Sequence, residues 1–332
     1  MKSGKIWQAT FAALAGAVLA LSFPGLGEAK DPSWPTKMNL VSGPVGGTSF
    51  TTMSPWAAEM SNRLGVSISP AATAGHSVNV RMVHAGQADF GVTTTDMALE
   101  GWEGKEKWTG NAKLQNNRGM FVLDPMALQM YALKRSNINS IQDVKGKIIN
   151  LSRAGSSVDV WMRRILDDLG IKPSRITNLA PSDANSNMAD GLLHVSAVNG
   201  SQPHPAPGEL EATNEIKIID WGKELAEKIS KKYPALGVVI IPARTYKNQT
   251  EPIYALGSFQ FAFANKSLPD SLVYEATKQT FEAKARLMAA NFAFKYLDPQ
   301  KISFATIPLH KGAAKYYEEV GVKIPAKIAP VP

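Results

Sequence analysis

The chain contains no cysteine, and only 19% of its 332 residues are charged. Without cysteine it can form no disulfide, no cysteine-ligated zinc or iron–sulfur site and no thiol nucleophile. The charged fraction is low and 44% of the residues are hydrophobic, which excludes a chain that is disordered throughout. The length is sufficient for two domains of ordinary size or for one large domain.

The sequence also lacks the motifs of common catalytic and nucleotide-binding sites. It has no P-loop, no G-x-S-x-G nucleophile elbow and no H-E-x-x-H zinc motif. The glycines at 43–47 do not have the G-x-G-x-x-G spacing of a dinucleotide-binding loop, and the five histidines are not spaced like zinc ligands. We therefore expect no enzymatic activity, no metal and no cofactor.

The first 29 residues have the layout of a secretory signal peptide. After a basic start, an almost unbroken apolar run extends from Ile6 to Phe23. Pro24 interrupts it, and Gly27 and Ala29 supply the small residues of a cleavage site before Lys30. An uncleaved membrane anchor is the alternative, because the run approaches the length of a bilayer span. We expect cleavage and a periplasmic location.

Export and charge together restrict the partners. The formal net charge is +8, which favours an anionic partner. The basic residues are spread along the chain, and no stripe of lysine and arginine with interleaved aromatics occurs. We therefore expect a small anionic ligand and no nucleic acid. The sequence does not fix the oligomeric state, and a monomer is the default expectation.

Strand and helix patterns alternate in two similar halves, and the pattern restarts after Asp124-Pro125. The expected strands are residues 38–41, 66–70, 88–93, 127–133, 148–151, 194–198, 216–219 and 258–264. The main expected helices are residues 53–64, 77–85, 97–102, 158–169, 272–294 and 313–320. This alternation predicts an α/β fold with a parallel sheet that helices cover on both faces.

The loop that opens each half carries the strongest chemical signal. Small and hydroxyl residues fill 43–49 and 152–157, each between a strand and a helix. Unpaired N–H groups and the helix dipole make such a helix start a site for a carboxylate or phosphate. Arg153 could add a forked pair with an acid. Ordinary capped turns are the alternative for each loop alone.

Histidine adds one candidate to these loops. His76 follows the turn at 74–75 and stands at a helix start, where it could reach a ligand. Helix capping is the alternative. We expect His84 and His310 to be structural or exposed to solvent.

Several segments along the chain carry a further signal. They are Gly46 to Phe50, Thr73 to Asn79, Gly86 to Gly91, Ile141 to Leu151, Gly155-Ser156, His204 to Pro207, Ile307 to His310 and Ala313 to Tyr317. In this order, and over nearly the whole chain after residue 30, they resemble the TAXI proteins, the solute receptors of one class of tripartite ATP-independent periplasmic (TRAP) transporters.

The resemblance implies a two-lobed periplasmic binding protein fold of type II, the Venus-flytrap form, with a ligand cleft between the lobes. Lobe 1 would comprise residues 30–125 and 256–332, and lobe 2 residues 126–255. The ligand would be a small organic acid such as a dicarboxylate or glutamate. Membrane permease subunits driven by an ion gradient would receive it.

The resemblance also implies a set of ligand-contacting residues. Carried over by position, these are Gly47, Thr48, Ser49, Phe50, Ser77, Thr94 and Thr95 on lobe 1, with Ser156 and Ser157 on lobe 2. The chain departs from the family at Phe50, His76 and Arg153, so its ligand could differ from glutamate. His204 either contacts the ligand or holds its loop between two prolines.

Three other functions stay open. A receptor of an ATP-driven importer for sulfonate- or thiamine-precursor-like ligands would have the same two-lobed architecture. An exported hydrolase that acts on a small anion is the enzymatic alternative, although no nucleophile–base pair is evident. A binding subunit that feeds a sensor instead of a transporter has no distinguishing feature in the sequence.

Overall fold

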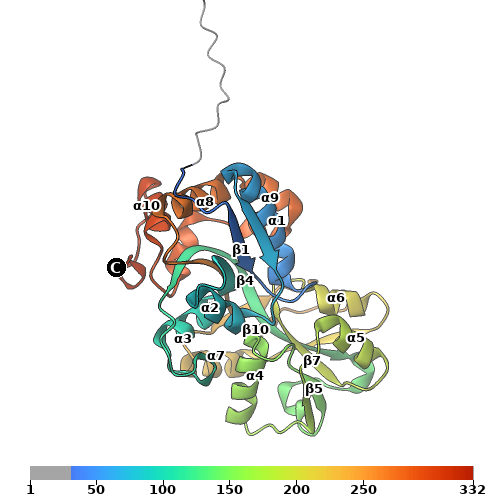
Figure 1. Ribbon diagram of the computed structural model, residues 1–332. Coiled ribbons are helices and arrows are strands. Elements are labelled where there is room, and N and C mark those ends of the chain that lie inside the picture. The colour runs from blue at the N-terminus through green and yellow to red at the C-terminus, as the bar shows by residue number, and fades with distance from the viewer. Residues whose placement is uncertain (1–30, 332) are drawn as a thin grey trace, which may run out of the picture.

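A computed structural model describes residues 31–331, and the expected signal peptide lies outside the described residues. Ten strands form one sheet in the order β2-β1-β3-β10-β4-β7-β5-β6, with β8 paired to β4 and β9 to β10 (Figure 1). The strands are β1 (Lys37–Val41), β2 (Ser67–Ala71), β3 (Phe90–Thr94), β4 (Asn117–Leu133), β5 (Ile148–Asn150), β6 (Arg175–Thr177), β7 (Val195–Gly200), β8 (Ile216–Ile219), β9 (Gly237–Ile241) and β10 (Ile253–Asn265).

Helices pack around this sheet. The α-helices are α1 (Thr48–Leu64), α2 (His76–His84), α3 (Thr95–Glu103), α4 (Ser157–Asp168), α5 (Pro181–Ala189), α6 (Pro205–Glu211), α7 (Lys223–Lys232), α8 (Asp270–Glu282), α9 (Lys284–Ala290) and α10 (Lys311–Glu319). Short 3₁₀ turns are η1 (Lys107–Thr109), η2 (Lys134–Ser136), η3 (Ile141–Val144), η4 (Phe292–Tyr296), η5 (Pro299–Phe304) and η6 (Ala326–Ile328). None of the helices in residues 31–331 is both long and apolar enough to cross a membrane.

The buried apolar residues form two separate clusters. The first core draws on residues 38–123 and 261–328, and includes Trp56 and Phe121. The second core draws on residues 127–256 together with Met97 from α3, and includes Trp161. Figure 1 shows α1, α8, α9 and α10 gathered at one end of the molecule, and α4, α5, β5 and β7 at the other.

Two long strands pass through both cores. β4 contributes residues 118–123 to the first half of the sheet and 127–133 to the second, and β10 pairs with it antiparallel over nearly its whole length. The expected parallel sheet is therefore wrong at its centre, where β10 pairs antiparallel with β3 and β4, and β4 pairs antiparallel with β7. The outer pairs β1–β2 and β5–β6 are parallel, as the alternating pattern predicts.

Asp124 and Pro125 do not end an element as expected. β4 continues through them, and a bulge lets the pairing with β10 change from Phe259–Pro125 to Phe261–Val122. A bulge accommodates proline in a strand because it has no N–H to donate. Asp124 is fully buried, its Oδ2 accepts a hydrogen bond from Ser201 Oγ at 2.5 Å, and burial raises its pKa to about 6.

Local sequence explains most of the remaining elements. α1 buries Met53, Trp56, Met60 and Leu64 at helical spacing and ends where Gly65 adopts φ +63°. The long helix expected over 272–294 is divided instead, because α8 ends at Glu282 and α9 and η4 follow. Strands β6 and β9 and helices α5, α6 and α7 are additional to those expected from the sequence.

Candidate functional site

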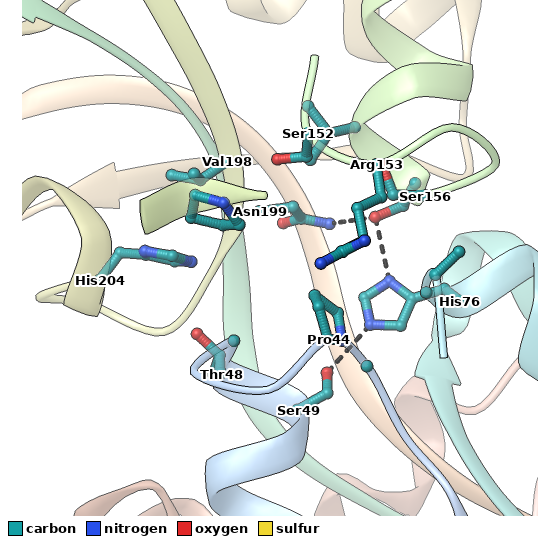
Figure 2. Close-up of a pocket in the computed structure, with 17 residues that line it drawn as sticks. Pro44, Thr48, Ser49, His76, Ser152, Arg153, Ser156, Val198, Asn199 and His204 are labelled. Atoms are coloured by element: carbon teal, nitrogen blue, oxygen red, sulfur yellow. Dashed lines mark hydrogen bonds between the residues drawn. The ribbon is translucent and has the colours of Figure 1, made fainter. Parts of the chain in front are cut away.

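A cavity of about 60 Å³ lies where four strand-to-helix loops meet (Figure 2). The loops β1–α1 and β2–α2 approach it from the first core, and β5–α4 and β7–α6 approach it from the second. Each loop follows the carboxyl end of a strand in a parallel pair. Ligand sites of open α/β sheets lie at this end.

Eight of the twelve residues expected at a binding site line this cavity. They are Gly47, Thr48, Ser49, His76, Arg153, Ser156, Ser157 and His204. Phe50, Ser77, Thr94 and Thr95 do not line it. Ser77 Oγ donates instead to the carbonyl of Gly155, and Thr95 Oγ1 accepts from the N–H of Phe259 at 3.2 Å.

Helices α1, α2 and α4 begin at the cavity, and α5 and α6 also begin at its lining, through Pro181 and the N-cap residue His204. α1 and α2 have glycine at the N-cap, no side-chain cap and no acidic residue in the first turn. Their first N–H groups therefore keep their hydrogen-bonding capacity for another acceptor. α4 differs, because Ser156 Oγ caps it by accepting from the N–H of Asp159 at 3.2 Å. The positive ends of the α1, α2 and α4 dipoles thus converge on one small space.

Thr48 presents an unused hydroxyl there. The residue is 6% exposed, and its Oγ1 has no hydrogen-bond partner among the described residues. Gly200 brings β7 against it: a Cβ atom at position 200 would lie 2.4 Å from Thr48 Oγ1. Buried hydroxyls nearly always have a partner, since an unmade hydrogen bond costs about 1–3 kcal/mol. The Thr48 hydroxyl is therefore a candidate donor at this edge of the cavity.

His204 offers a second neutral donor. Its Nδ1 accepts from the N–H of Ala206 at 3.1 Å, which assigns the ring proton to Nε2. Burial lowers the pKa of His204 to about 4, so the ring is neutral near pH 7. The N–H of His204 donates to Tyr246 Oη at 2.9 Å, and Tyr246 donates to Gln129 at 2.6 Å. This chain fixes the ring at the edge of the cavity (Figure 2).

His76 connects the two sides of the cavity. Its Nε2 lies 3.0 Å from Ser49 Oγ on α1, and its Nδ1 lies 3.0 Å from Ser157 Oγ on α4. Burial lowers the pKa of His76 to about 4. Asn199 Nδ2 donates to the same Ser157 oxygen at 3.0 Å. His76 therefore serves as a polar bridge rather than as a charge.

Arg153 is the cationic side chain of the cavity wall. Among residues 31–331 no carboxylate pairs with it, and Figure 2 shows its guanidinium pointing between Asn199 and His76. The neighbouring Ser152 has φ +55°, a strained value for a residue with a side chain. Ser152 Oγ donates to the carbonyl of Ala197 at 2.9 Å and thereby holds this conformation.

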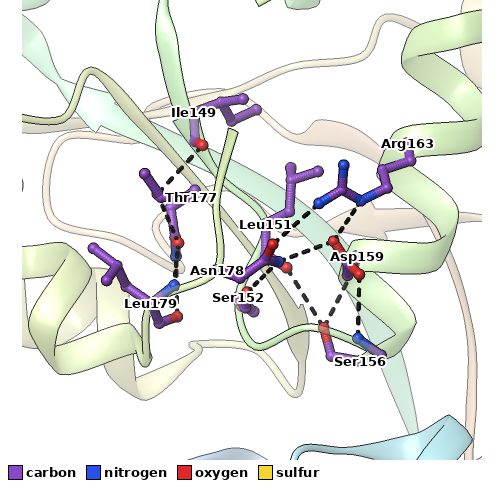
Figure 3. Close-up of polar contacts among 11 residues, drawn as sticks. Ile149, Leu151, Ser152, Ser156, Asp159, Arg163, Thr177, Asn178 and Leu179 are labelled. Carbon is purple, nitrogen blue, oxygen red and sulfur yellow. Dashed lines mark hydrogen bonds and ion pairs between the residues drawn. The ribbon is translucent and has the colours of Figure 1, made fainter. Parts of the chain in front are cut away.

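A polar network behind the loop fixes its shape (Figure 3). Asn178 Nδ2 donates to the carbonyl of Ser152 at 2.8 Å and to Asp159 Oδ1 at 2.9 Å. Asp159 also accepts from Arg163 Nε at 2.7 Å and from the N–H of Gly155 at 3.1 Å. The loop that carries Arg153 is thus tied to β6 and α4.

The two cores also touch away from the cavity, where α3 lies against α4. Arg164 donates to Glu100 at 2.6 Å and to Glu106 at 2.7 Å. Trp161 Nε1 donates to Asp96 Oδ2 at 2.5 Å, and Arg164 stacks over the Trp161 ring at 4.3 Å. We call this set the α3–α4 contact. Burial raises the pKa of Glu100 despite its bonds to Arg164 and Trp108.

Among residues 31–331, no aspartate and no glutamate lines the cavity. In the part of the chain that the structure describes, no group of three His, Asp or Glu side chains could hold a metal ion. With two neutral histidines and one arginine, the site is suited to a small anion.

Asn199 is the main lining residue that the sequence did not suggest. Asn199 lies near the carboxyl end of β7. Because β7 runs parallel to β5, Asn199 and the Arg153 loop lie at the same edge of the sheet. Its Oδ1 is buried and unpartnered among the described residues. The sequence signal that could have identified Asn199 is a polar residue next to a glycine at the end of a strand.

Comparison with known proteins places the chain in a family. The model of the NMT1-like family matches residues 40–321. The chain belongs to the NMT1-like family. Its fold is similar to that of MatC from Rhodopseudomonas palustris, which was solved with bound malate. The TM-score is 0.57 and the sequence identity 12%, and the match covers 87% of this chain and 98% of MatC. It is also similar to the periplasmic binding protein BugD, at a TM-score of 0.53 and 12% identity, covering 79% and 88%.

These likenesses establish the fold. The chain has the mixed α/β architecture of type II periplasmic binding proteins, as the resemblance found in the sequence implied. The family match covers both cores.

Proposed function

We propose that this protein is a periplasmic receptor that captures a small organic anion between two lobes and delivers it to a membrane transporter. The observation that carries the proposal is the convergence of Arg153, Thr48 and the uncapped starts of α1 and α2 on one cavity. The fold of solute-binding proteins and the sequence layout of an exported chain support it.

The lobes would correspond to residues 30–125 with 256–332, and to residues 126–255. β4 and β10 are the two connections between the cores, so the lobes would close by bending near residues 124–126 and 252–257. An anion touching Thr48 on one lobe and Arg153 on the other binds the closed form better. Binding then shifts the population toward the closed form, by an amount set by the difference in affinity between the closed and the open form.

The transporter would be of the TRAP type, as the TAXI resemblance implies. Family membership alone is equally compatible with a receptor of an ATP-driven importer. Uptake of the identified ligand by cells that produce this protein separates the two. A protonophore or sodium ionophore stops TRAP transport while cellular ATP is held constant, whereas depletion of ATP alone stops the importer.

Arg153→Met provides the direct test of the binding site. Removing the guanidinium should weaken binding of an organic anion at least tenfold in titration calorimetry, because the lining offers no other cation. The protein is first unfolded and refolded to remove any copurified ligand.

Arg175→Met is the matched control, since Arg175 is exposed on β6 and away from the cavity. It removes the same charge and should leave the dissociation constant unchanged. Equal losses of affinity in both variants would mean that Arg153 acts only through the overall electrostatic attraction between protein and anion. An unchanged constant in Arg153→Met would remove it from the site.

A further inference from the structure

We propose that the ligand is a small hydroxycarboxylate: an anion with one carboxylate in the cavity and a hydroxyl on the adjacent carbon. The inference rests on the proposed receptor function and names its substrate class. Three features of the cavity carry it: the distribution of hydrogen-bond donors and acceptors, the absence of negative charge and the volume.

Donors dominate one part of the wall. Thr48 and His204 both line the cavity, and both lie close to Gly200, where a Cβ atom would be 2.4 Å from Thr48 Oγ1 and 2.9 Å from His204 Nε2. The start of α1 lies directly beside Thr48, and Arg153 faces it across the cavity. A carboxylate has about four acceptor positions and can take hydrogen bonds from several of these donors together.

An amino acid does not suit this wall. Its ammonium group would need a carboxylate or several acceptors, and the lining contains no acidic side chain. The first-turn N–H groups and Arg153 would repel it. This argues against glutamate, which the family resemblance had placed among the expected ligands.

Asn199 supplies the acceptor that distinguishes among the remaining acids. Its amide nitrogen is committed to Ser157, while its buried Oδ1 has no partner among the described residues. A ligand hydroxyl can donate to this oxygen. A 2-oxoacid would instead present a carbonyl oxygen to it, and an unsubstituted acid would leave it unpaired, at a cost of about 1–3 kcal/mol.

The volume limits the carbon skeleton. One water-sized group needs about 10–15 Å³ of such space, so the cavity of about 60 Å³ holds roughly four to six. The hydrogen bond between His76 Nδ1 and Ser157 Oγ, at 3.0 Å, joins loops of the two cores at the cavity and sets their spacing in this structure. The space corresponds to a skeleton of three carbons, since lactate has six non-hydrogen atoms, whereas malate has nine and would need a wider opening.

A matched series tests the inference by titration calorimetry on refolded protein. Propionate, pyruvate, L-alanine and both enantiomers of lactate share one skeleton and differ only at the second carbon. Succinate, oxaloacetate, L-aspartate and malate repeat the comparison with four carbons. Within at least one series the hydroxy acid should bind tenfold or more tightly than each of its analogues, which follows from one buried hydrogen bond.

Two variants of Asn199 assign the preference to its side chain. Asn199→Ala should make the hydroxy acid and the unsubstituted acid bind equally. Asn199→Asp keeps the size, places a negative charge beside the ligand, and should shift the preference toward the amino acid. Asn248→Ala, at an exposed asparagine outside the cavity, should keep the preference of the parent protein.

The outcomes separate the two proposals. Equal affinity for the hydroxy, oxo and unsubstituted acids, or tightest binding of the amino acid or oxoacid, overturns the hydroxycarboxylate inference and leaves the receptor function standing. An unchanged preference in Asn199→Ala also overturns it. Failure of every anion to bind the refolded protein overturns the receptor function and the inference together.

Discussion

The cavity and the α3–α4 contact both lie between the two cores, but they use polar groups in opposite ways. At the α3–α4 contact the guanidinium of Arg164 bridges two carboxylates, and Asp96 accepts from Trp161 and from Ser258. At the cavity Thr48 Oγ1 and Asn199 Oδ1 are buried without partners, and Arg153 has no carboxylate within the described residues.

This difference separates stability from binding. Fully paired groups hold the two cores together without a ligand, whereas unpaired groups keep their hydrogen-bonding capacity for one. Substitutions at the α3–α4 contact should therefore change the free energy of unfolding, and substitutions at the cavity should change ligand affinity.

The largest effect is expected from Arg164→Ala. The variant leaves Glu100, whose side chain is 9% exposed, without its cation, and removes the stacking on Trp161. Breaking such a pair from one side should lower the free energy of unfolding by about 4 kcal/mol in urea denaturation. Lys105→Ala breaks an exposed pair with Glu103 nearby and should cost less than about 0.5 kcal/mol. Similar losses of unfolding free energy in both variants would contradict the distinction between the α3–α4 contact and an exposed ion pair.

The next effect concerns pH, and two buried groups should show opposite slopes. His204 has a folded pKa of about 4 against 6.5 in the reference state, so its contribution to stability is lost as pH falls from about 6.5 to 4. Asp124 has a folded pKa of about 6 against 3.8, so its contribution is lost as pH rises through 6. Each full change amounts to about 3 kcal/mol.

Urea denaturation between pH 4.5 and 8 measures these slopes. Asp124→Asn should gain stability relative to the parent as pH rises, because the variant has no carboxyl to ionise in the interior. His204→Asn should gain relative to the parent as pH falls, because no imidazole then takes up a proton on unfolding. Parallel pH profiles for the parent and both variants would contradict the assigned protonation states.

The smallest effect is also the most specific. Thr48→Val keeps the shape of the side chain and removes the hydroxyl, so anion affinity should fall about tenfold. The stability of the ligand-free protein should not fall, because this hydroxyl has no partner to lose. Ser258→Ala is the converse: its hydroxyl donates to Asp96 at 2.5 Å, so stability should fall while affinity holds. Reversed effects would show that the two regions are not distinct.

Much of the local structure was predictable from the sequence. The spacing of Met53, Trp56 and Met60 predicted α1, and the glycine and hydroxyl residues beside Arg153 predicted a loop before α4. These features depend on neighbours in the sequence. The positions of Thr48, Ser156 and His204 at one cavity agree with the expectation that they contribute to a single site, and their contact with a ligand stays a prediction.

The remaining features depend on distant parts of the chain. Nothing near Asp124 and Pro125 indicates that a strand continues, because the bulge that accommodates proline is formed by β10, more than a hundred residues later. The bridge from His76 to Ser157 and the unpaired Oδ1 of Asn199 likewise arise only when the loops of both cores meet.

The position of β10 between β3 and β4 also constrains the order in which the chain folds. β3 and β4 are close in sequence, yet the sheet cannot join them until residues 253–265 insert between them. The pairs β1–β2 and β1–β3 on one side, and β4–β7 on the other, need no later strand to begin pairing. Closing so long a loop is slow, so the two halves of the sheet should form before β10 joins them. The sheet, and with it the cavity between its two halves, is therefore completed only when the last third of the chain is available.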